Sequence, residues 1–360
     1  MKTKTKSMAR TPGKSGRNAL LASMGLTAML LGMGILGAGA SAKTRTHMHR
    51  AGPASAHVSI LLDWTPNTDH TGLYAAVAQG YFHSEGVVPT ISVPANPGNA
   101  LEEVAAGRAD FAVSYEPDVL LARQQGIPIR SVMALVDRPL NTIMSLTSSH
   151  ITSARDLKGK SIGITGVPSD YAVVHAVLEY AHVPLSSVHL VRVGYNLLPA
   201  LLHHRVNAVE GVYWTWEAVQ VRQMGYRVNV LHLEQVGVPT YDELVLVTSN
   251  QLLRRDPSLV RRTLRAIQEG YAFAFAHPGP AGTDLLKETQ GLSPKLIRAS
   301  LVLLHGAFDY KVPTVGYQNP ADWRRYMAWM VHYHLLKHPV SIPGAMSNGF
   351  LTPGIGANGH

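Results

Sequence analysis

Three side chains in this sequence have the chemistry to bind a planar ring that carries an N–H group. Trp64 follows a short apolar run at residues 58–62, and a large aromatic side chain in a loop after a strand could cover one face of a flat ligand. Tyr213 and Glu217 are four residues apart, so on a helix, or in its first turn, they would lie on one face. A carboxylate at that place could accept a hydrogen bond from the ligand while the aromatic covers its ring.

The same residues also have structural interpretations. Trp64 could pack between its strand and the following helix. Trp214 and Trp216 could belong to the core, with Glu217 a solvated charge that favours the dipole of a helix start. In the binding interpretation Tyr213 and Glu217 lie near Trp64, and in the structural one they need not. These residues are far apart along the chain, so the sequence favours neither arrangement.

Further candidates lie where predicted strands end. Ligand-binding loops of open α/β sheets are found there, and the candidates of this kind are Asn67, Ser114, Tyr115 and Glu116. Ser169 and Asp170 follow another predicted strand and begin a helix. They could cap that helix, or its first amides could hold a ligand oxygen.

Short apolar strands alternate with amphipathic helices from Val58 onward, which indicates an α/β fold. The expected strands are residues 58–62, 90–93, 111–114, 129–135, 161–164, 188–193, 208–212, 228–233 and 244–248. The expected helices include residues 99–106, 170–181, 257–276, 281–288, 294–305 and 321–336.

The order of these elements predicts two interleaved lobes with a ligand cleft between them. We expect residues 58–143 and 243–360 to form the first lobe and residues 144–242 to form the second. The chain would then cross between the lobes twice, near residues 140–145 and 239–244, and these crossovers would serve as a hinge. A cleft at such a seam is the default site for a small molecule.

The N-terminal region has the pattern of an export signal. Six basic residues and no acidic residue precede an apolar run at residues 19–40, which ends in Ala40-Ser41-Ala42. We therefore expect residues 1–42 to be a signal peptide and residues 43–57 a disordered linker. The run could also span a bilayer, so the alternative is an uncut membrane anchor. The chain has no cysteine, which excludes disulfides, and we expect a periplasmic or secreted protein.

The formal net charge of +9 would suit a nucleic-acid or membrane-surface partner. Most of this charge lies in the predicted leader and linker, where the basic residues of the linker are Lys43, Arg45 and Arg50. The remaining chain is close to neutral, so we expect no nucleic-acid partner. Nothing in the sequence indicates an oligomer, and we expect a monomer.

Several phrases, in their order, resemble the periplasmic solute-binding proteins of the nitrate, sulfonate, taurine and thiamin-pyrimidine superfamily. They are GVV at residues 86–88, AAGRADFAV at residues 105–113 and DLKGKSIG at residues 156–163, and the resemblance covers residues 58–329. LDWTPN at residues 62–67, YWTWE at residues 213–217 and YDELVLVT at residues 241–248 look like the branch that binds formylaminopyrimidine, a thiamin breakdown product.

This resemblance implies a two-lobed type II periplasmic-binding-protein fold and an ABC permease in the inner membrane as partner. It implies that Trp64 and Tyr213 stack on a pyrimidine ring and that Glu217 binds its exocyclic amine, with Tyr241 also at the ligand. The function expected is capture of a thiamin-related aminopyrimidine, such as formylaminopyrimidine or hydroxymethylpyrimidine, for salvage. A riboflavin binder and a sulfonate-like or nitrate-like solute binder are the alternatives.

The superfamily also contains enzymes that synthesise the thiamin pyrimidine. Aligned with them, this chain places Ser114 where they carry a lysine that holds pyridoxal phosphate, and Asp118 where they carry a reactive histidine. The cysteines of their iron motif are absent from this sequence. His334 and His338 are spaced like two metal ligands on a helix, but they lack a third. We therefore expect a binding protein without a cofactor or a metal, and a pyrimidine-synthesising enzyme on the same scaffold is the last alternative.

Overall fold

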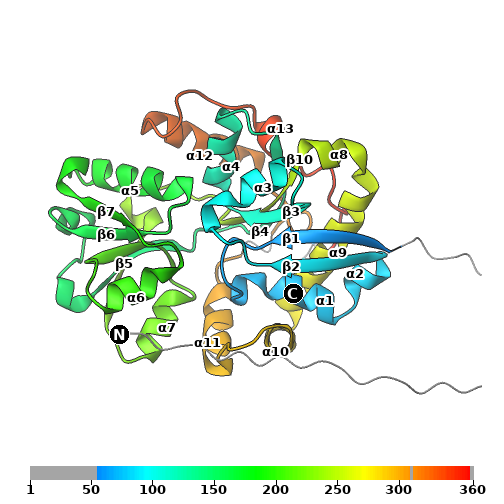
Figure 1. Cartoon of the computed structure of the whole chain (residues 1–360), viewed down its shortest axis with the longest axis horizontal. Helices are drawn as coiled ribbons and strands as arrows, with labels where there is room; N and C mark the ends of the chain where they lie inside the picture. The colour runs from blue at the N-terminus through cyan, green and yellow to red at the C-terminus, as the bar shows by residue number, and fades with distance from the viewer. Residues whose placement is uncertain (1–54, 309–310, 357–360) are drawn as a thin grey trace, which may run out of the picture. The chain divides into compact units, whose positions relative to one another are not determined.

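The computed structural model describes residues 55–308 and 311–356, and two mixed β-sheets organise them (Figure 1). The first sheet has the strand order β2-β1-β3-β10-β4. β1 is parallel to β2 and β3, whereas β10 is antiparallel to β3 and β4. Its strands are β1 (Ala56–Leu61), β2 (Val87–Ser92), β3 (Phe111–Ser114), β4 (Ile129–Val136) and β10 (Leu244–Ser249).

The second sheet repeats this plan with the order β7-β6-β8-β5-β9. β6 is parallel to β7 and β8, and β5 is antiparallel to β8 and β9. Its strands are β5 (Asn141–Leu146), β6 (Ser161–Ile164), β7 (His189–Arg192), β8 (Ala208–Tyr213) and β9 (Val228–His232). We call each sheet with its helices a lobe.

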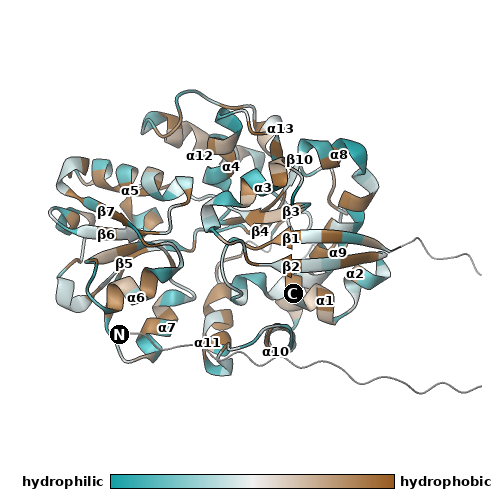
Figure 2. Ribbon diagram, in the orientation of Figure 1, coloured by the Kyte–Doolittle hydropathy of each residue, from teal (hydrophilic) through white to brown (hydrophobic). Residues whose placement is uncertain are grey.

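The sequences of the strands explain their places in the sheets. β3 and β10 lie inside the first sheet, and every residue of both is buried, as the near-continuous apolar sequence of a covered strand requires. β2 is at the edge, and its exposed residues alternate with less exposed ones, which is typical of a strand with one covered face. Apolar residues colour much of both sheets brown in Figure 2.

Helices cover the sheets. They are α1 (Thr71–Ala78), α2 (Tyr81–Ser84), α3 (Ala100–Ala105), α4 (Glu116–Gln124), α5 (Pro168–Tyr180), α6 (Leu197–Leu202), α7 (Glu217–Gln223), α8 (Asn250–Arg255), α9 (Pro257–Ala276), α10 (Pro278–Glu288), α11 (Pro294–His305), α12 (Pro320–His332) and α13 (Ile342–Ala345). Several start in the way their sequences predict: α9 has Asp256 as N-cap and proline in its first turn. In the described part of the chain no helix has the length and apolarity needed to span a membrane.

The close packing of α1 on α9 fixes the loop that contains Trp64. Gly72 has no side chain, and a Cβ atom there would lie 2.3 Å from the ring of Tyr271, so only glycine admits this ring. The Tyr271 hydroxyl donates to the backbone oxygen of Asp69 at 2.7 Å. The segment between β1 and α1 is therefore held on a rigid support.

The chain crosses between the lobes twice, as expected. The first crossover lies between β4 and β5 and the second between β9 and β10. The expected lobe boundary after residue 143 is a few residues late, because Asn141 already pairs with Tyr213 in the second sheet. The expected linker also ends too late, since β1 begins at Ala56. The predicted signal peptide lies outside the described residues.

C-terminal helix α12 contacts the second crossover. The indole nitrogen of Trp329 donates to the backbone oxygen of Gly237 at 2.9 Å, and the ring centroids of Tyr326 and Tyr241 are 4.8 Å apart. α12 ends at His332, so His334 and His338 are not one turn apart on a helix as predicted. The described residues hold no group of three or more His, Asp or Glu that could bind a metal ion.

Candidate functional site

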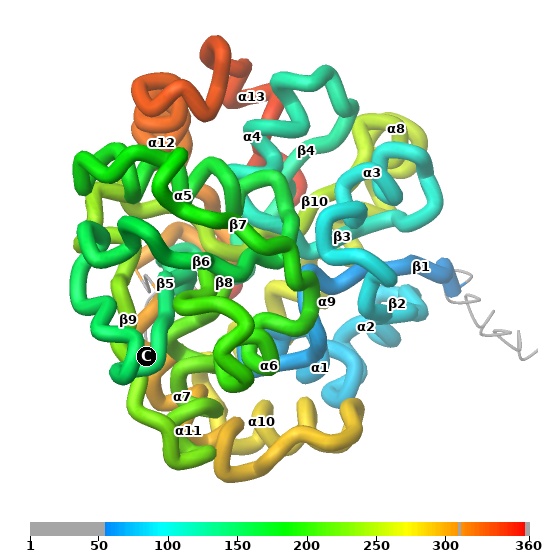
Figure 3. The backbone as a smooth tube through the Cα atoms, turned by 60° about the vertical axis from the view of Figure 1, so that its left-hand side comes forward, coloured from blue at the N-terminus to red at the C-terminus, as the bar shows by residue number. Residues whose placement is uncertain are grey.

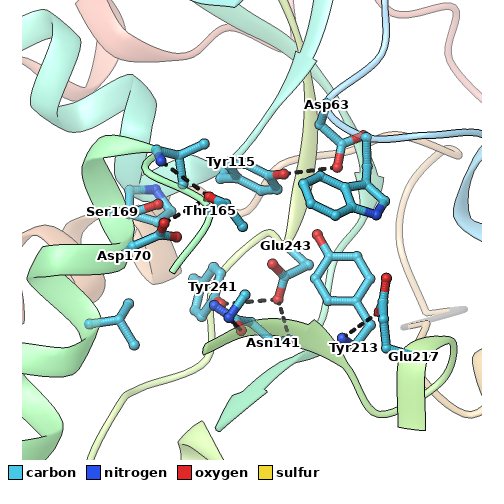
Figure 4. Close-up of a pocket in the computed structure, with 15 residues that line it drawn as sticks. Asp63, Tyr115, Asn141, Thr165, Ser169, Asp170, Tyr213, Glu217, Tyr241 and Glu243 are labelled. Atoms are coloured by element: carbon cyan, nitrogen blue, oxygen red, sulfur yellow. Dashed lines mark hydrogen bonds between the residues drawn. The ribbon is translucent and has the colours of Figure 1, made fainter. Parts of the chain in front are cut away.

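A pocket of about 520 Å3 lies between the lobes, at the crossovers. Loops at strand ends of both sheets supply its walls, together with the crossovers (Figure 4). The side chains that carry the argument are Asp63, Trp64, Tyr115, Asn141, Thr165, Ser169, Asp170, Tyr213, Glu217, Tyr241 and Glu243. The position agrees with the rule that ligands bind outside strand ends in open α/β sheets.

Asp63 anchors the wall contributed by the first lobe. Its Oδ2 accepts a hydrogen bond from the Tyr115 hydroxyl at 2.9 Å, and its Oδ1 is 2.8 Å from Nε2 of His70. The backbone N–H of Asn67 donates to Nδ1 of His70, which leaves Nε2 to donate to Asp63. This chain of bonds holds the Tyr115 ring against the pocket.

Glu243 joins the two crossovers. Its Oε2 accepts from the backbone N–H groups of Leu140 and Asn141, at 2.7 and 2.9 Å, and from the Tyr241 hydroxyl at 3.0 Å. The other oxygen, Oε1, faces the pocket (Figure 4). Burial raises the pKa of Glu243 to about 7, although these hydrogen bonds favour the charged form.

Glu217 and Tyr213 come together at a turn. Tyr213 is the last residue of β8 and Glu217 the first of α7, so the expected helical spacing is wrong, but the two residues do meet. The backbone N–H of Tyr213 donates to Oε2 of Glu217 at 2.8 Å. Burial raises the pKa of Glu217 to about 7. The buried hydroxyl of Tyr213 has no hydrogen bond of normal geometry.

Asp170 and Ser169 close the pocket on the side of the second lobe. Oδ2 of Asp170 accepts from the Thr165 hydroxyl at 2.7 Å and from the Gly166 N–H at 2.6 Å. Burial raises the pKa of Asp170 to about 6. The N–H of Ser169 donates to Oδ1 of Asp118 at 2.7 Å, so a carboxylate of the protein already uses this helix-start amide.

Trp64 is half-buried and lies at the mouth of the pocket. Its ring centroid is 4.6 Å from that of Tyr195, with the planes tilted by 47°. Tyr195 comes from the second lobe, and its hydroxyl donates to the backbone oxygen of Pro94 in the first lobe at 2.8 Å. The Trp64–Tyr195 pair is therefore a contact between the lobes.

Comparison with known proteins places this geometry in a family. The family model described as NMT1/THI5 like matches residues 67–281. The chain belongs to this family. The formylaminopyrimidine-binding protein of Halalkalibacterium halodurans is 32% identical over 295 residues, which cover 81% of this chain and 89% of that protein.

Other relatives of this NMT1/THI5-like protein have names that describe different functions. A riboflavin-binding protein of Chloroflexus aurantiacus is 29% identical and covers 88% of this chain and 92% of that protein. A 4-amino-5-hydroxymethyl-2-methylpyrimidine phosphate synthase of Legionella pneumophila is 25% identical and covers 82% and 92%.

Solved structures share the fold. The alkanesulfonate-binding protein of Xanthomonas axonopodis superposes with a TM-score of 0.64 at 16% identity, over 82% of this chain and 99% of that one. The two-lobed periplasmic-binding-protein architecture expected from the sequence is confirmed.

Most of the site residues predicted for this NMT1/THI5-like protein line the pocket. They are Trp64, Tyr115, Ser169, Asp170, Tyr213, Glu217 and Tyr241. Asn67 does not, because its side chain accepts from the N–H of Asp69 at 2.8 Å and caps the turn before α1. Ser114 lines a neighbouring cavity instead, and Glu116 accepts from the backbone N–H of Asp242 at 2.8 Å.

The sequence did not single out Asp63, Asn141, Thr165 and Glu243 as site residues. Asp63 is adjacent to Trp64, and Glu243 lies inside the motif at residues 241–248, so both were within reach of the motif argument. Asn141 carried no signal. Its side chain donates to Oε1 of Glu210 at 2.7 Å and accepts from the N–H of Gly211 at 3.0 Å, which ties the first crossover to β8.

The electrostatics of the pocket are one-sided. Asp63, Asp170, Glu217 and Glu243 line it, and the described residues that line it include no lysine, arginine or histidine. The raised pKa values of the last three carboxyls lie near neutrality, so each can accept a hydrogen bond or, when protonated, donate one. Such a pocket suits a neutral or cationic ligand rich in N–H groups and disfavours an anion.

Proposed function

We propose that this protein is the substrate-binding component of an ABC importer and that it captures a thiamin-related aminopyrimidine. The single observation that carries the proposal is the lining of the pocket: carboxyl groups and aromatic rings converge there, and no basic side chain faces them. The similarity to a formylaminopyrimidine-binding protein supports the same ligand class.

An aminopyrimidine matches the pocket in shape and in hydrogen bonding. Its flat ring fits between Trp64 and Tyr213, and stacking on an aromatic side chain contributes about 1–3 kcal/mol per contact by analogy with nucleobases. Its exocyclic amine can donate to Oε1 of Glu243 or to Glu217. A carboxyl group with a pKa near 7 can also share a proton with a ring nitrogen, so that one of its oxygens pairs with the amine and the other with the ring.

The alternative solutes fit less well. Sulfonate and nitrate are anions, and bringing one beside four carboxyl groups costs electrostatic energy with no cation to offset it. The likeness to an alkanesulfonate-binding structure concerns the fold alone. Riboflavin also has a flat ring system, and ligand measurements must decide between it and a single pyrimidine.

A binding protein also suits the site better than a synthase. The described lining of the pocket has no lysine that could form a Schiff base with pyridoxal phosphate and no basic group to hold its phosphate. Ser114, which the resemblance places where the synthases carry their lysine, is outside the pocket. We therefore propose an exported, monomeric protein that passes its ligand to a permease without changing it.

Isothermal titration on the chain from Lys43, unfolded and refolded to remove carried ligand, tests this proposal. The panel is formylaminopyrimidine, hydroxymethylpyrimidine, riboflavin, taurine and nitrate. We expect binding of the two pyrimidines only, and a thermal shift in parallel, because a ligand at one hundred times its Kd stabilises a protein by about 2.7 kcal/mol. Binding of taurine or nitrate without the pyrimidines would refute the proposed ligand class.

The variant Glu217→Gln sharpens the test. It keeps a carbonyl oxygen to accept from the Tyr213 N–H, so the turn is preserved, but it removes the carboxylate. We expect a larger loss for the aminopyrimidine than for a methylpyrimidine that lacks the amine. Equal losses of affinity for both compounds would show that Glu217 does not recognise the amine.

A further inference from the structure

A second and larger chamber adjoins the pocket between the lobes. It has about 1610 Å3 of empty space when open solvent is included. Trp64 and Glu217 line both spaces, so the inner pocket and this outer chamber adjoin at these two side chains. Tyr195, which stacks on Trp64, also lines the outer chamber.

The walls of the outer chamber come from both lobes. Trp216, Gln220 and Met224 contribute from α7 and the residues on either side of it, and residues 288–293 contribute from the end of α10 and the loop that leads to α11. α7 and α11 lie side by side in Figure 3, and the side chain of Gln223 reaches the backbone oxygen of Lys295 at 3.5 Å. The chamber is thus built by segments that are far apart in the sequence.

The chemistry of these walls is apolar and amide-rich, with negative charge only. Glu217 and Glu288 are the acidic residues among the described lining, and no lysine, arginine or histidine is among them. The nearby Lys287 does not line the chamber, and its ammonium is 3.3 Å from Oδ1 of Asp284. A phosphate would meet no cation here, whereas an uncharged or cationic ring would meet Tyr195, Trp216 and Met224.

The size of the chamber matters for the choice of ligand. Counted in the same way, with open solvent included, the inner pocket has about 520 Å3, one third of the volume of the outer chamber, and its lining suits a single ring with a short substituent. A ligand of that size leaves the outer chamber unused. A substituent that continues past Trp64 and Glu217 would fill it.

We propose that this protein also accepts aminopyrimidines that carry a second, uncharged or cationic ring, which lies in the outer chamber. The inference rests on the proposed function, because the inner pocket must hold the aminopyrimidine. Trp64 and Tyr195 then lie between the positions of the two rings. The negative charges of Glu217 and Glu288 favour a cationic second ring over a phosphorylated one.

Isothermal titration with three probes tests the inference: formylaminopyrimidine, thiamin and thiamin monophosphate. Thiamin carries a cationic ring on its aminopyrimidine, and its monophosphate adds an anion. We expect thiamin to bind within about tenfold of formylaminopyrimidine, or more tightly. We expect the monophosphate to bind at least about tenfold more weakly than thiamin, because its phosphate meets only like charge.

Two variants locate the second ring. Gln220→Trp places bulk in the outer chamber from one turn beyond Glu217, and we expect at least about a tenfold loss for thiamin with formylaminopyrimidine unchanged. Arg222→Trp is the matched control, because Arg222 is exposed on the same helix and does not line the chamber; it should change neither affinity. Glu288→Gln, at an exposed residue, gives a milder change if Gln220→Trp fails to fold, and it should weaken thiamin alone.

The outcomes separate the two proposals. Tight binding of formylaminopyrimidine with thiamin more than about a hundredfold weaker would overturn the inference and leave the proposed function intact. Equal losses for both probes in Gln220→Trp would also overturn it, because the chamber would then not be specific to the second ring. Binding of none of the three probes would overturn the proposed function and this inference with it.

Discussion

Replacing Glu243 separates its structural role from its role in binding. Three donors converge on its Oε2, namely the N–H groups of Leu140 and Asn141 and the hydroxyl of Tyr241. Glutamine keeps one carbonyl oxygen, which can take the place of Oε2 and retain all three bonds. Its amide NH2 group then takes the place of Oε1 and turns an acceptor in the pocket into a donor.

The expected magnitudes follow from this geometry. A hydrogen bond to a charged acceptor contributes about 1.5–3 kcal/mol, so Glu243→Gln should weaken an aminopyrimidine by a factor of about 10 to 150. Its free energy of unfolding should change little. Glu243→Ala leaves three donors without a partner, and each buried unsatisfied group costs about 1–3 kcal/mol, so we expect a loss of at least about 3 kcal/mol in stability.

Titration calorimetry at pH 8, where the Glu243 carboxyl is mostly charged, and urea unfolding at pH 6, where it is mostly neutral like glutamine, measure the two quantities. Glu243→Gln should show weak binding with a near-normal unfolding midpoint, and Glu243→Ala should show a clearly lower midpoint. Full affinity in the glutamine variant would refute the assignment of Oε1 to ligand recognition. A normal midpoint in the alanine variant would refute the claim that Glu243 holds the two crossovers together.

Three further predictions concern other contacts of the same region. Trp64→Ala should lose about 1–3 kcal/mol of ligand affinity in calorimetry. Its melting temperature should stay near normal, because Trp64 is only half-buried and contacts Tyr195 and the edge of an apolar cluster in the second lobe. Collapse of the fold would instead support a packing role. The pKa of Glu217 is raised from 4.5 to about 7, so its contribution to stability is fully present below about pH 4.5 and is lost as the pH rises through about 7, by up to about 3 kcal/mol. Glu217→Gln should therefore reduce the fall in unfolding free energy between pH 5 and 8. An unchanged dependence of the unfolding free energy on pH would contradict this. Trp323→Phe removes the indole N–H that donates to buried Asp242 at 2.7 Å, and we expect a loss of about 1–3 kcal/mol in chemical unfolding, against no loss if that carboxyl group is satisfied without it.

The sequence predicted strands that are rich in apolar residues, as buried strands are, but it did not predict strand β5. The strands at residues 111–114 and 161–164 were predicted with their observed bounds, because each is a short apolar run between turn-forming residues. β5 begins with Asn141 and contains Ser145, and it was assigned to the hinge. Its place between β8 and β9 depends on pairing with distant strands, which local composition does not specify.

The site shows the same division between local and long-range information. Side chains at strand ends could be predicted because parallel strands end at one edge of a sheet. Asn67 also follows a strand, but its side chain accepts a hydrogen bond from the backbone of its own turn. Asparagine side chains often bond to nearby backbone in this way. The role of Glu243 could not be predicted, because its three donors belong to both crossovers, about a hundred residues apart along the chain.

Ligand recognition and the hinge share one carboxyl group in this protein. Oε2 of Glu243 fixes the first crossover to the second, while Oε1 faces the pocket. Without a ligand, burial makes the charged forms of Glu243, Glu217 and Asp170 costly, as their raised pKa values show. A ligand that brings N–H groups offsets part of that cost. Because the same contacts link the two crossovers, the proposed ligand would stabilise the arrangement of the lobes in which the pocket is closed around it.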